Sequence, residues 1–240
     1  MKLVRLRFLW RSDLHRYYGK SNLSTFLRML FVYWEAPGAK YAFLLRLVAY
    51  LRVAMPRPLF TPLYVIMRIV LKRYEYKWHI QIPPAVRIGS GIFIGHFGDI
   101  VIHGCVILGA NCNISQGVTI GQSSRGPYKG TPILGDNVFI GPGAKIFGRI
   151  HIGNNVAIGA NCVVTRDIPD NAVVVGVPAR IISYKGSEGY ILNTDYLTPS
   201  DATLEGVASE QHMGAVVPMS LHRVHHPQGE QEQRRSRVER

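Results

Sequence analysis

Three histidines in the middle of this 240-residue chain, His96, His103 and His151, are its candidates for acid–base chemistry. An imidazole titrates near neutrality, so it can accept a proton from a reacting group and return it in a later step. His96 lies between Gly95 and Gly98, where a six-residue sequence repeat is interrupted. His151 occupies an outward position of that repeat and His103 a corner position, so we expect structural roles for both. Their spacing does not suit three ligands from neighbouring repeats, and no metal site is predicted.

The repeat itself spans residues 82–182 and has a step of six. Each unit has an aliphatic residue, in most cases followed by glycine, and a small or β-branched residue four positions after the aliphatic one. The aliphatic residues stand at 88 and 94, then 102, 108, 114 and 120, then 134, 140, 146, 152, 158 and 164. A period of six fits neither a helix nor a solitary strand, but it fits a triangular coil with three flat sides. We therefore predict a left-handed parallel β-helix with coils about 4.8 Å apart, its aliphatic residues inside and glycine at the tight corners.

Two interruptions of the step of six indicate segments that leave the regular coils. The first adds two residues beside His96, where aliphatic positions 94 and 102 are eight apart. The second follows position 120 and inserts QSSRGPYKGT, which should form an exposed loop with Arg125 and Lys129. A surface insertion without function would look the same. Because loops on rigid scaffolds commonly carry binding groups, we expect this loop to contribute to the site.

The regions on either side of the repeat differ from it in composition. Residues 1–80 carry fifteen basic and three acidic side chains, and apolar residues recur there at helical spacing, which predicts a basic helical N-terminal region. The β-helix is expected over residues 81–184 and a C-terminal extension with a disordered tail over 185–240. Three cysteines cannot close a disulfide framework. We interpret the tail histidines as part of a flexible polar end, not a metal site: His222, His225 and His226.

The cationic N-terminal region admits three interpretations: a solvated cap on the β-helix, a nucleic-acid site, or contact with an anionic membrane. No basic–aromatic nucleic-acid motif is present, so nucleic acid is not a predicted partner. We favour a membrane surface bound through residues 1–78, because aromatic residues are interleaved with Lys and Arg. These aromatic residues are Phe8, Trp10, Phe26, Trp34 and Phe60. No signal peptide and no apolar stretch of spanning length is evident, which favours a cytoplasmic protein attached peripherally at the inner face of the membrane.

The segments IGSGIFIGHFGDIVI, NISQGVTIGQ, GDNVFIGPGAKIFGRIHIGNNVAIGANCVVTRDIP and VVVGVPARII follow one another within residues 80–182. In order and spacing they resemble the hexapeptide-repeat acyltransferases, and among them the serine acetyltransferase branch. The N-terminal segment RSDLHRYYGK is more similar to acetyltransferases of exopolysaccharide and colanic-acid-type biosynthesis. The resemblance implies acetyl-CoA as donor, a hydroxyl acceptor, and a homotrimer with active sites between neighbouring prisms.

The same resemblance implies roles for individual residues. His96 matches the catalytic histidine, which would take the proton of the acceptor hydroxyl as it attacks the thioester and return it to the leaving thiolate. Acetyl-CoA would meet the chain near Pro142 and Ala160, with Lys145 and Arg149 approaching its phosphates. Solvated corner charges are the alternative role for these two basic side chains.

Features that hold serine in true serine acetyltransferases differ in this sequence. By the resemblance, Gln81 stands where those enzymes have the aspartate that orients the catalytic histidine, and Gly95 stands where they have an acidic residue that contacts the substrate. Thr131 and Gly130 stand where they have a loop histidine and the arginine before it. Loss of a carboxylate that pairs with the substrate ammonium removes a charge-assisted hydrogen bond. Free serine is therefore expected to bind poorly.

The predicted function is acetyl-CoA-dependent O-acetylation of a hydroxyl on a sugar or polysaccharide precursor, with His96 as general base. Acceptor contacts are expected from Gln81, Gly95, Arg125, Lys129 and Thr131. The group that orients His96 stays open between Asp99, Glu75 and a backbone carbonyl. Two alternatives are a serine O-acetyltransferase of cysteine biosynthesis and a non-catalytic β-helix scaffold that binds partners.

Overall fold

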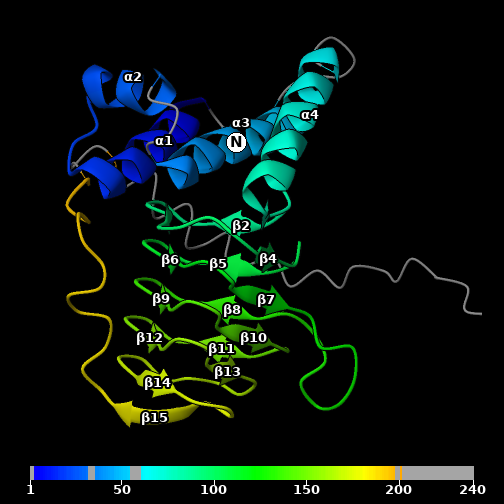
Figure 1. The fold of residues 1–240 in the computed structure, drawn as a ribbon, viewed down its shortest axis with the longest axis vertical. Coiled ribbons are helices and arrows are strands. Elements are labelled where there is room, and N and C mark those ends of the chain that lie inside the picture. Colours follow the sequence, from blue (N-terminus) through cyan, green and yellow to red (C-terminus); the bar gives the residue numbers. More distant parts are fainter. Residues whose placement is uncertain (1–2, 32–35, 55–60, 198–200, 202–240) are drawn as a thin grey trace, which may run out of the picture.

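The computed structural model describes residues 3–31, 36–54, 61–197 and 201. A cap of four helices covers one end of a stack of short strands (Figure 1). The helices are α1 (Leu3–Tyr18), α2 (Leu23–Phe31), α3 (Pro37–Ala54) and α4 (Thr61–Trp78). None of these described helices is long and apolar enough to span a bilayer.

Local sequence signals set several of the helix ends. Gly19 follows α1 with φ +63°, the left-handed conformation that commonly ends a helix. Asn22 precedes α2, and its side chain accepts a hydrogen bond from the Thr25 amide at 2.9 Å while the Thr25 hydroxyl accepts one from the Asn22 amide at 3.1 Å. Pro37 and Pro62 lie in the first turns of α3 and α4, where a proline loses no helical hydrogen bond.

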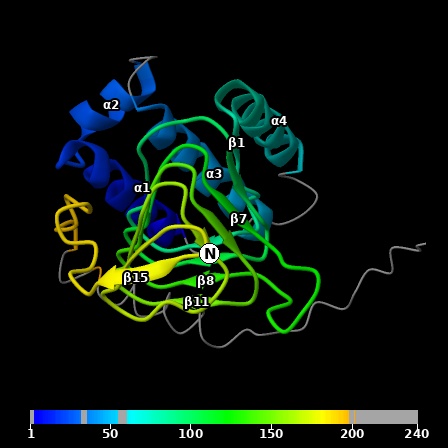
Figure 2. The same cartoon turned by 60° about the horizontal axis from the view of Figure 1, so that its bottom comes forward.

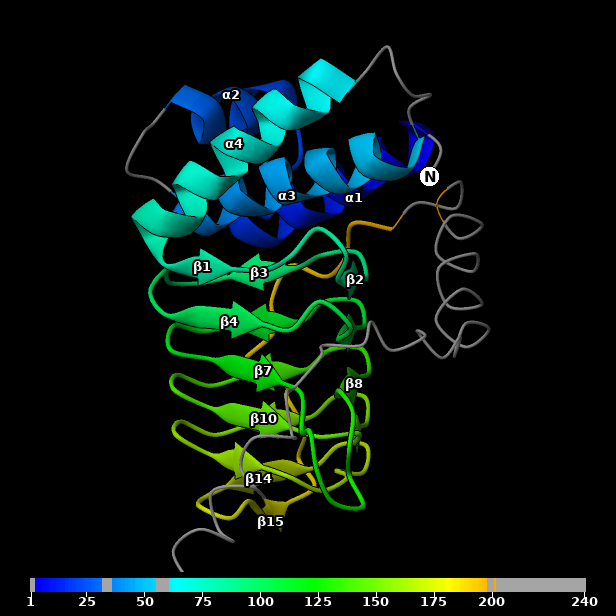
Figure 3. The same ribbon diagram turned by 90° about the vertical axis from the view of Figure 1, so that its right-hand side faces the viewer.

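Three sheets form the sides of a prism below the cap (Figure 3). Sheet A contains β1 (Ile80–Gln81), β4 (Ile100–Ile102), β7 (Thr119–Gly121), β10 (Lys145–Phe147) and β13 (Val163–Val164). Sheet B contains β2 (Arg87–Ile88), β5 (Ile107–Leu108), β8 (Ile133–Leu134) and β11 (His151–Ile152). Sheet C contains β3 (Phe93–Ile94), β6 (Asn113–Ile114), β9 (Phe139–Ile140), β12 (Ala157–Ile158), β14 (Val173–Val175) and the antiparallel β15 (Arg180–Ser183). From β1 to β13 the strands fall into sheets A, B and C in rotation, which confirms the predicted left-handed parallel β-helix (Figure 2).

The interior of the prism follows the predicted hexad. The aliphatic residues at 94, 102, 108, 114, 120, 134, 140, 146, 152, 158 and 164 are at most 2% exposed. The small residues beside them are at most 1% exposed: Val106, Cys112, Val118, Val138, Ala144, Val156 and Cys162. Burial of each large aliphatic side chain stabilises the fold by about 1.5–3 kcal/mol, so the repeat supplies most of the core.

The glycine after the inward residue has a different role from the one predicted. Gly141 does not have a left-handed backbone, but a Cβ there would lie 2.7 Å from the carbonyl oxygen of Ile158 in the next coil. Close approach of the coils therefore requires glycine at this position. The left-handed corner residue stands two positions later, as Gly143 (φ +73°) in one coil and Asn161 (φ +54°) in the next.

Strands β1–β3 of the first coil pair with β4–β6 on one side only, so their remaining backbone groups need partners from the cap. Helix α1 supplies several of them. The Ser12 hydroxyl accepts a hydrogen bond from the Gly91 amide at 3.1 Å, and Asp13 Oδ1 accepts one from the Ile92 amide at 3.0 Å. Arg16 donates to the Gly91 carbonyl at 2.9 Å. The sequence RSDLHRYYGK is thus the segment that covers the open edge.

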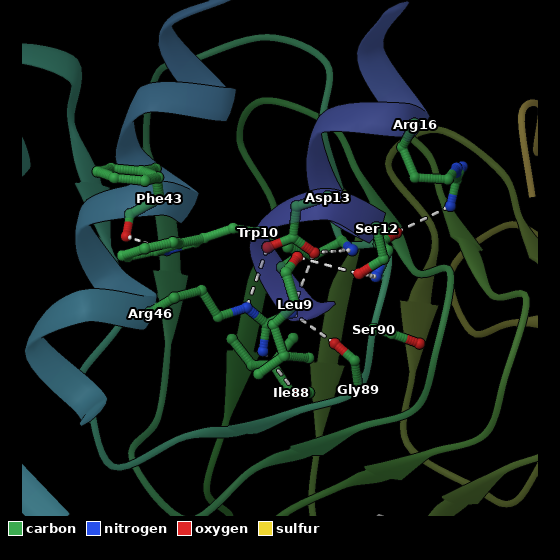
Figure 4. Close-up of polar contacts among 12 residues, drawn as sticks. Leu9, Trp10, Ser12, Asp13, Arg16, Phe43, Arg46, Ile88, Gly89 and Ser90 are labelled. Carbon is green, nitrogen blue, oxygen red and sulfur yellow. Dashed lines mark hydrogen bonds and ion pairs between the residues drawn. The ribbon is translucent and has the colours of Figure 1, made fainter. Parts of the chain in front are cut away.

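Helix α3 contributes a buried arginine to the same edge (Figure 4). Arg46 donates to the carbonyl of Ile88 at 2.7 Å and to that of Gly89 at 2.5 Å. Its Nε also pairs with Asp13 Oδ2 at 3.0 Å, and both side chains are less than a tenth exposed. The ion pair joins α1 to α3 and ties both helices to the first coil.

The N-terminal aromatic residues that we expected at a membrane are largely core residues. Phe8 is 5% exposed. Trp10 stacks on Phe43 with ring centroids 4.3 Å apart, and Phe26 packs on the same ring at 5.5 Å. This part of the prediction is wrong, because Trp10 and Phe26 join α1 and α2 to α3, and Phe8 packs on Tyr196. The other two aromatics lie outside the described residues: Trp34 and Phe60.

The chain after β15 returns along the prism to the cap (Figure 1). Tyr190 stacks on Phe139 with ring centroids 4.6 Å apart, and the Tyr196 hydroxyl contacts Asn111 Oδ1 at 2.7 Å. Arg16 donates to the Leu192 carbonyl at 2.7 Å. The predicted disordered tail and its three histidines lie outside the described residues.

The three cysteines differ sharply in environment. Cys112 and Cys162 are 0% exposed inside the prism, whereas Cys105 is exposed at a corner. Burial raises the pKa of the Cys112 thiol to about 12 and also raises the pKa of Cys162. Both buried thiols therefore stay protonated and unreactive near neutral pH.

Removing the buried arginine should destabilise the cap. Arg46→Met leaves the Asp13 carboxylate buried without its partner, so we expect the free energy of unfolding to fall by about 3–5 kcal/mol in urea titrations followed by tryptophan fluorescence. The control Arg52→Met changes an exposed side chain of the same helix and should change the free energy of unfolding by no more than about 0.5 kcal/mol. Equal stability of the two variants would contradict the account of the cap.

Thiol labelling tests the burial of the repeat cysteines. In the native protein, Cys105 should react with a thiol-specific disulfide reagent roughly a hundredfold faster than Cys112 or Cys162, because only its thiol is exposed. Denaturation should make all three react. Rapid labelling of a second cysteine in the folded protein would show that the coils are packed differently.

Candidate active site

His96 lies at the open corner where β3 of sheet C turns into β4 of sheet A. Residues 95–97 are exposed there, and Phe97 is 54% exposed. The two inserted residues make this turn: Gly98 has φ +114° and Asp99 has φ +53°, so the backbone swings outward before rejoining the sheet. The insertion therefore presents the imidazole at the surface of the isolated chain.

The same corner recurs in each coil below His96, over residues 115–118, 141–144 and 159–162. We call these segments, together with residues 95–99, the His96 corner. Backbone hydrogen bonds tie them into one column: the Gly117 amide donates to Gly98 at 2.7 Å, the Gly143 amide to Gln116 at 2.9 Å, and the Asn161 amide to Pro142 at 2.8 Å. Pro142 and Ala160 are exposed on this column, two and three coils below His96.

The first strand of the site is clamped from above by α1. The Tyr17 hydroxyl accepts a hydrogen bond from the Ile94 amide at 2.8 Å and donates to the Ile94 carbonyl at 3.2 Å. Burial raises the pKa of the Tyr17 phenol above its usual range, so the hydroxyl keeps the proton that it donates. The Tyr17 ring also packs on Phe93 with ring centroids 4.5 Å apart. Both contacts fix β3 immediately before His96.

Two polar groups at this corner were not identified from the sequence. Gln116 lies one coil below the His96 loop, and its side-chain oxygen Oε1 is buried without a hydrogen-bond partner. Buried polar atoms normally have a partner, so this oxygen is an acceptor at the corner that the described chain does not satisfy. His79, with φ +50°, lies beside the corner, and its Nδ1 is 3.7 Å from Asp99 Oδ1. A period of six assigns residues to a corner but does not reveal which side-chain atoms lack partners.

Glu75, one of the groups considered for orienting His96, is engaged elsewhere. Its carboxylate oxygens pair with Arg68 at 3.0 Å and with Lys72 at 2.8 Å, and the side chain is 5% exposed. It therefore belongs to the packing of α4. Asp99 faces His79 and is 86% exposed.

The inserted loop leaves the prism at a different corner from His96. It connects β7 of sheet A to β8 of sheet B, and Ser123 and Gly130 bridge its two ends with paired hydrogen bonds of 2.9 Å. Arg125 and Lys129 are exposed on it, and the Thr131 hydroxyl donates to the Cys105 carbonyl at 3.3 Å. Within one chain, the width of sheet A separates these residues from His96.

The remaining predicted site residues fall on or beside sheet A. Gln81 is exposed on β1, opposite Val101 of β4. Lys145 reaches back to the His96 corner, where it donates to the Gly117 carbonyl at 2.6 Å and to the Thr119 hydroxyl at 3.0 Å. Arg149 is exposed at the loop corner, where its amide donates to the Tyr128 carbonyl at 2.8 Å. Lys145 is thus close to the His96 corner, whereas Arg149 is not.

The other two histidines of the repeat lie apart from this corner. His151 is exposed on β11 of sheet B, and His103 is half-buried with Nδ1 accepting from the Cys105 amide at 3.3 Å. Among the residues that the structure describes, no group of three His, Cys, Asp or Glu side chains could hold a metal ion.

Comparison with known proteins gives consistent results. Residues 131–166 match the family described as bacterial transferase hexapeptide (six repeats). A serine acetyltransferase of Synechococcus elongatus is 43% identical over 123 residues, which cover 51% of this chain and 50% of that protein. The chain thus spans about half the length of this relative.

Solved structures extend the likeness beyond the repeat. The serine acetyltransferase of Brucella abortus superposes with a TM-score of 0.60 at 30% identity, covering 75% of this chain and 69% of that one. A structure of the B. abortus enzyme in complex with coenzyme A gives a TM-score of 0.60 at 29% identity, with 74% and 68% covered. The predicted sugar or polysaccharide acceptor is contradicted by these relatives, which are named for serine. The chain belongs to the hexapeptide-repeat transferases.

Proposed function

We propose that this protein is an O-acetyltransferase that moves the acetyl group of acetyl-CoA to the hydroxyl of L-serine, with His96 as general base. The observation that carries the proposal is the His96 corner: an exposed imidazole above a hydrogen-bonded column with Pro142 and Ala160 on its surface. The names of the relatives and the coenzyme A complex of one of them support the donor and the acceptor.

The reaction needs one group that first accepts and then donates a proton. The imidazole of His96 would take the serine hydroxyl proton as the oxygen attacks the thioester carbonyl carbon. The tetrahedral intermediate would then expel the CoA thiolate, which takes the proton back from the imidazolium. A new ester bond replaces the thioester bond, and the imidazole returns to its starting state.

The donor would lie along the His96 corner. Its pantetheine arm would run past Ala160 and Pro142, so that the thioester reaches His96 two coils above Pro142, about 10 Å away at the coil spacing. Gln116 lies between these points, and its unpartnered Oε1 would accept a hydrogen bond from a pantetheine amide. Lys145 is close enough to the same corner to approach a phosphate if it releases the Gly117 carbonyl.

The loop residues would enter the site from a second copy of the chain. Arg125, Lys129 and Thr131 belong to the corner at the other end of sheet A, so one chain does not bring them to His96. A homotrimer with prisms side by side would place the loop of one copy against the His96 corner of the next. Gln81 and Gly95 would complete the acceptor side in this arrangement.

The division of the chain into residues 1–80, 81–184 and 185–240 fits this function as a cap, a catalytic β-helix and an extension. The likeness of RSDLHRYYGK to exopolysaccharide-type acetyltransferases finds no support among these relatives, and we attach no acceptor to it. In this protein all of the segment except Gly19 and Lys20 lies in α1, and it covers the first coil.

Replacing His96 tests the base. His96→Ala should lower kcat for serine-dependent CoA release by ~10²–10⁴-fold without changing the unfolding transition. The control His151→Ala removes an exposed histidine of sheet B and should retain full activity. The assay detects the CoA thiol, so both variants belong in a Cys105→Ser background, which removes the exposed protein thiol. Full activity of His96→Ala would exclude it as the base, and no CoA release by the parent with any acceptor would favour the scaffold alternative.

Gln116 provides a test that separates binding from stability. In Gln116→Leu the unpartnered buried oxygen is lost, so stability should stay equal or rise, while the KM for acetyl-CoA rises about tenfold. The control Tyr184→Leu changes an exposed side chain after β15 and should leave this KM unchanged. A loss of stability with an unchanged KM would assign Gln116 to the fold instead of the donor site.

A further inference from the structure

Helix α4 has one face that packs on the protein and another that does not. Its inner face includes Leu71 and Trp78, which are 0% and 6% exposed. The opposite face carries large apolar side chains at helical spacing, and they are between 46% and 71% exposed: Val65, Ile66, Ile69 and Tyr76. We call these four residues, together with the exposed Arg73 among them, the α4 outer face.

The α4 outer face is not covered by the prism or by the rest of the described cap. In Figures 1 and 3 the helix lies on the side of α3 opposite α1, and its carboxyl end leads into the first coil. The carboxyl end of α4 contacts the His96 corner, where the Trp78 carbonyl accepts from the Gly98 amide at 3.0 Å, whereas Val65, Ile66 and Ile69 lie in the first half of the helix.

The exposed charged side chains of α4 itself are all basic. The one acidic residue of α4, Glu75, is buried and paired with Arg68 and Lys72. Asp13, the other carboxylate of the described cap residues, is buried and paired with Arg46. Arg73 is exposed, and Lys72 Nζ lies 5.0 Å from the ring centre of Tyr76. The outer face thus combines exposed apolar side chains with positive charge and has no exposed carboxylate from its own helix.

We propose that the α4 outer face docks on an anionic lipid surface. Apolar side chains on a basic amphipathic helix enter the boundary between head groups and acyl chains, while neighbouring Lys and Arg side chains interact with anionic head groups. This assigns membrane contact to Val65, Ile66, Ile69 and Tyr76, and not to Phe8, which is buried, or to Trp10, which stacks on Phe43. The helix lies in the interface and does not cross the membrane.

Charge also separates this occupant from a second copy of the chain. Two α4 outer faces placed together would bury the apolar residues, but they would also bring the Arg73 side chains of both copies close, and the one carboxylate of each helix, Glu75, is buried and already paired with Arg68 and Lys72. Like charges held together across an interface oppose association. An anionic surface satisfies both the apolar and the cationic character of this face.

Sedimentation with lipid vesicles tests the proposal on the full-length protein. We expect binding to vesicles of phosphatidylcholine mixed with phosphatidylserine, little binding to phosphatidylcholine alone, and weaker binding as salt is raised. Two variants should each reduce this binding by roughly tenfold. One is the double variant Ile66→Ser with Ile69→Ser, and the other is the single variant Arg73→Glu. A matched control at the far end of the prism, Ile182→Ser with Lys185→Glu, changes an exposed apolar and an exposed basic residue and should bind like the parent.

Three results would overturn the proposal. They are equal binding to neutral and anionic vesicles, no binding to either, or unchanged binding by both α4 variants. Sedimentation without vesicles tests whether a second copy of the chain covers this face instead. If the protein self-associates and the double variant Ile66→Ser with Ile69→Ser does not, the face is assigned to a second copy. CoA release without vesicles should be unchanged in all these variants, so failure of membrane docking and failure of the acetyltransferase proposal give different results.

Discussion

Each coil of this prism is held by backbone hydrogen bonds to its neighbours, and the first coil has a neighbour on one side only. The open edge would leave those amides and carbonyls of residues 82–94 that point away from the second coil without partners inside the fold. Side chains of α1 and α3 supply them, from Ser12, Asp13 and Tyr17 to Tyr41 and Arg46. Because His96 follows β3 of this coil, the contacts that complete the edge also fix the proposed base.

The cap explains why a basic segment stands before a nearly neutral β-helix. Arg16 and Arg46 are buried, where their guanidinium groups donate to backbone carbonyls of the first coil. Arginine suits this role because it presents several donors in a fixed geometry and stays charged. Asp13 offsets the charge of Arg46 and accepts from the Ile92 amide, so the buried ion pair is fully hydrogen-bonded. Basic residues on the outer side of α4, such as Arg73, are not part of this network.

The sequence was sufficient for the parts of the structure that depend on period. The step of six predicts the β-helix and its core, and the interruption at His96 predicts an exposed turn. Counting coils would also have placed Arg125 and His96 at different corners. Contacts between distant segments could not be predicted in this way: Trp10 and Phe26 pack on Phe43, and no periodic signal distinguishes this from exposure. The true role of Gly141 likewise depends on the spacing between coils, which appears only when the chain is folded.

The central claim is that the His96 corner transfers acetyl from acetyl-CoA to serine, and product analysis tests it most directly. The purified protein is incubated with acetyl-CoA and L-serine, and the products are identified and quantified by mass spectrometry. The account predicts O-acetylserine and free CoA in equal amounts, with neither formed above background by His96→Ala. Free CoA without acetylated serine, or equal product from His96→Ala, would contradict it.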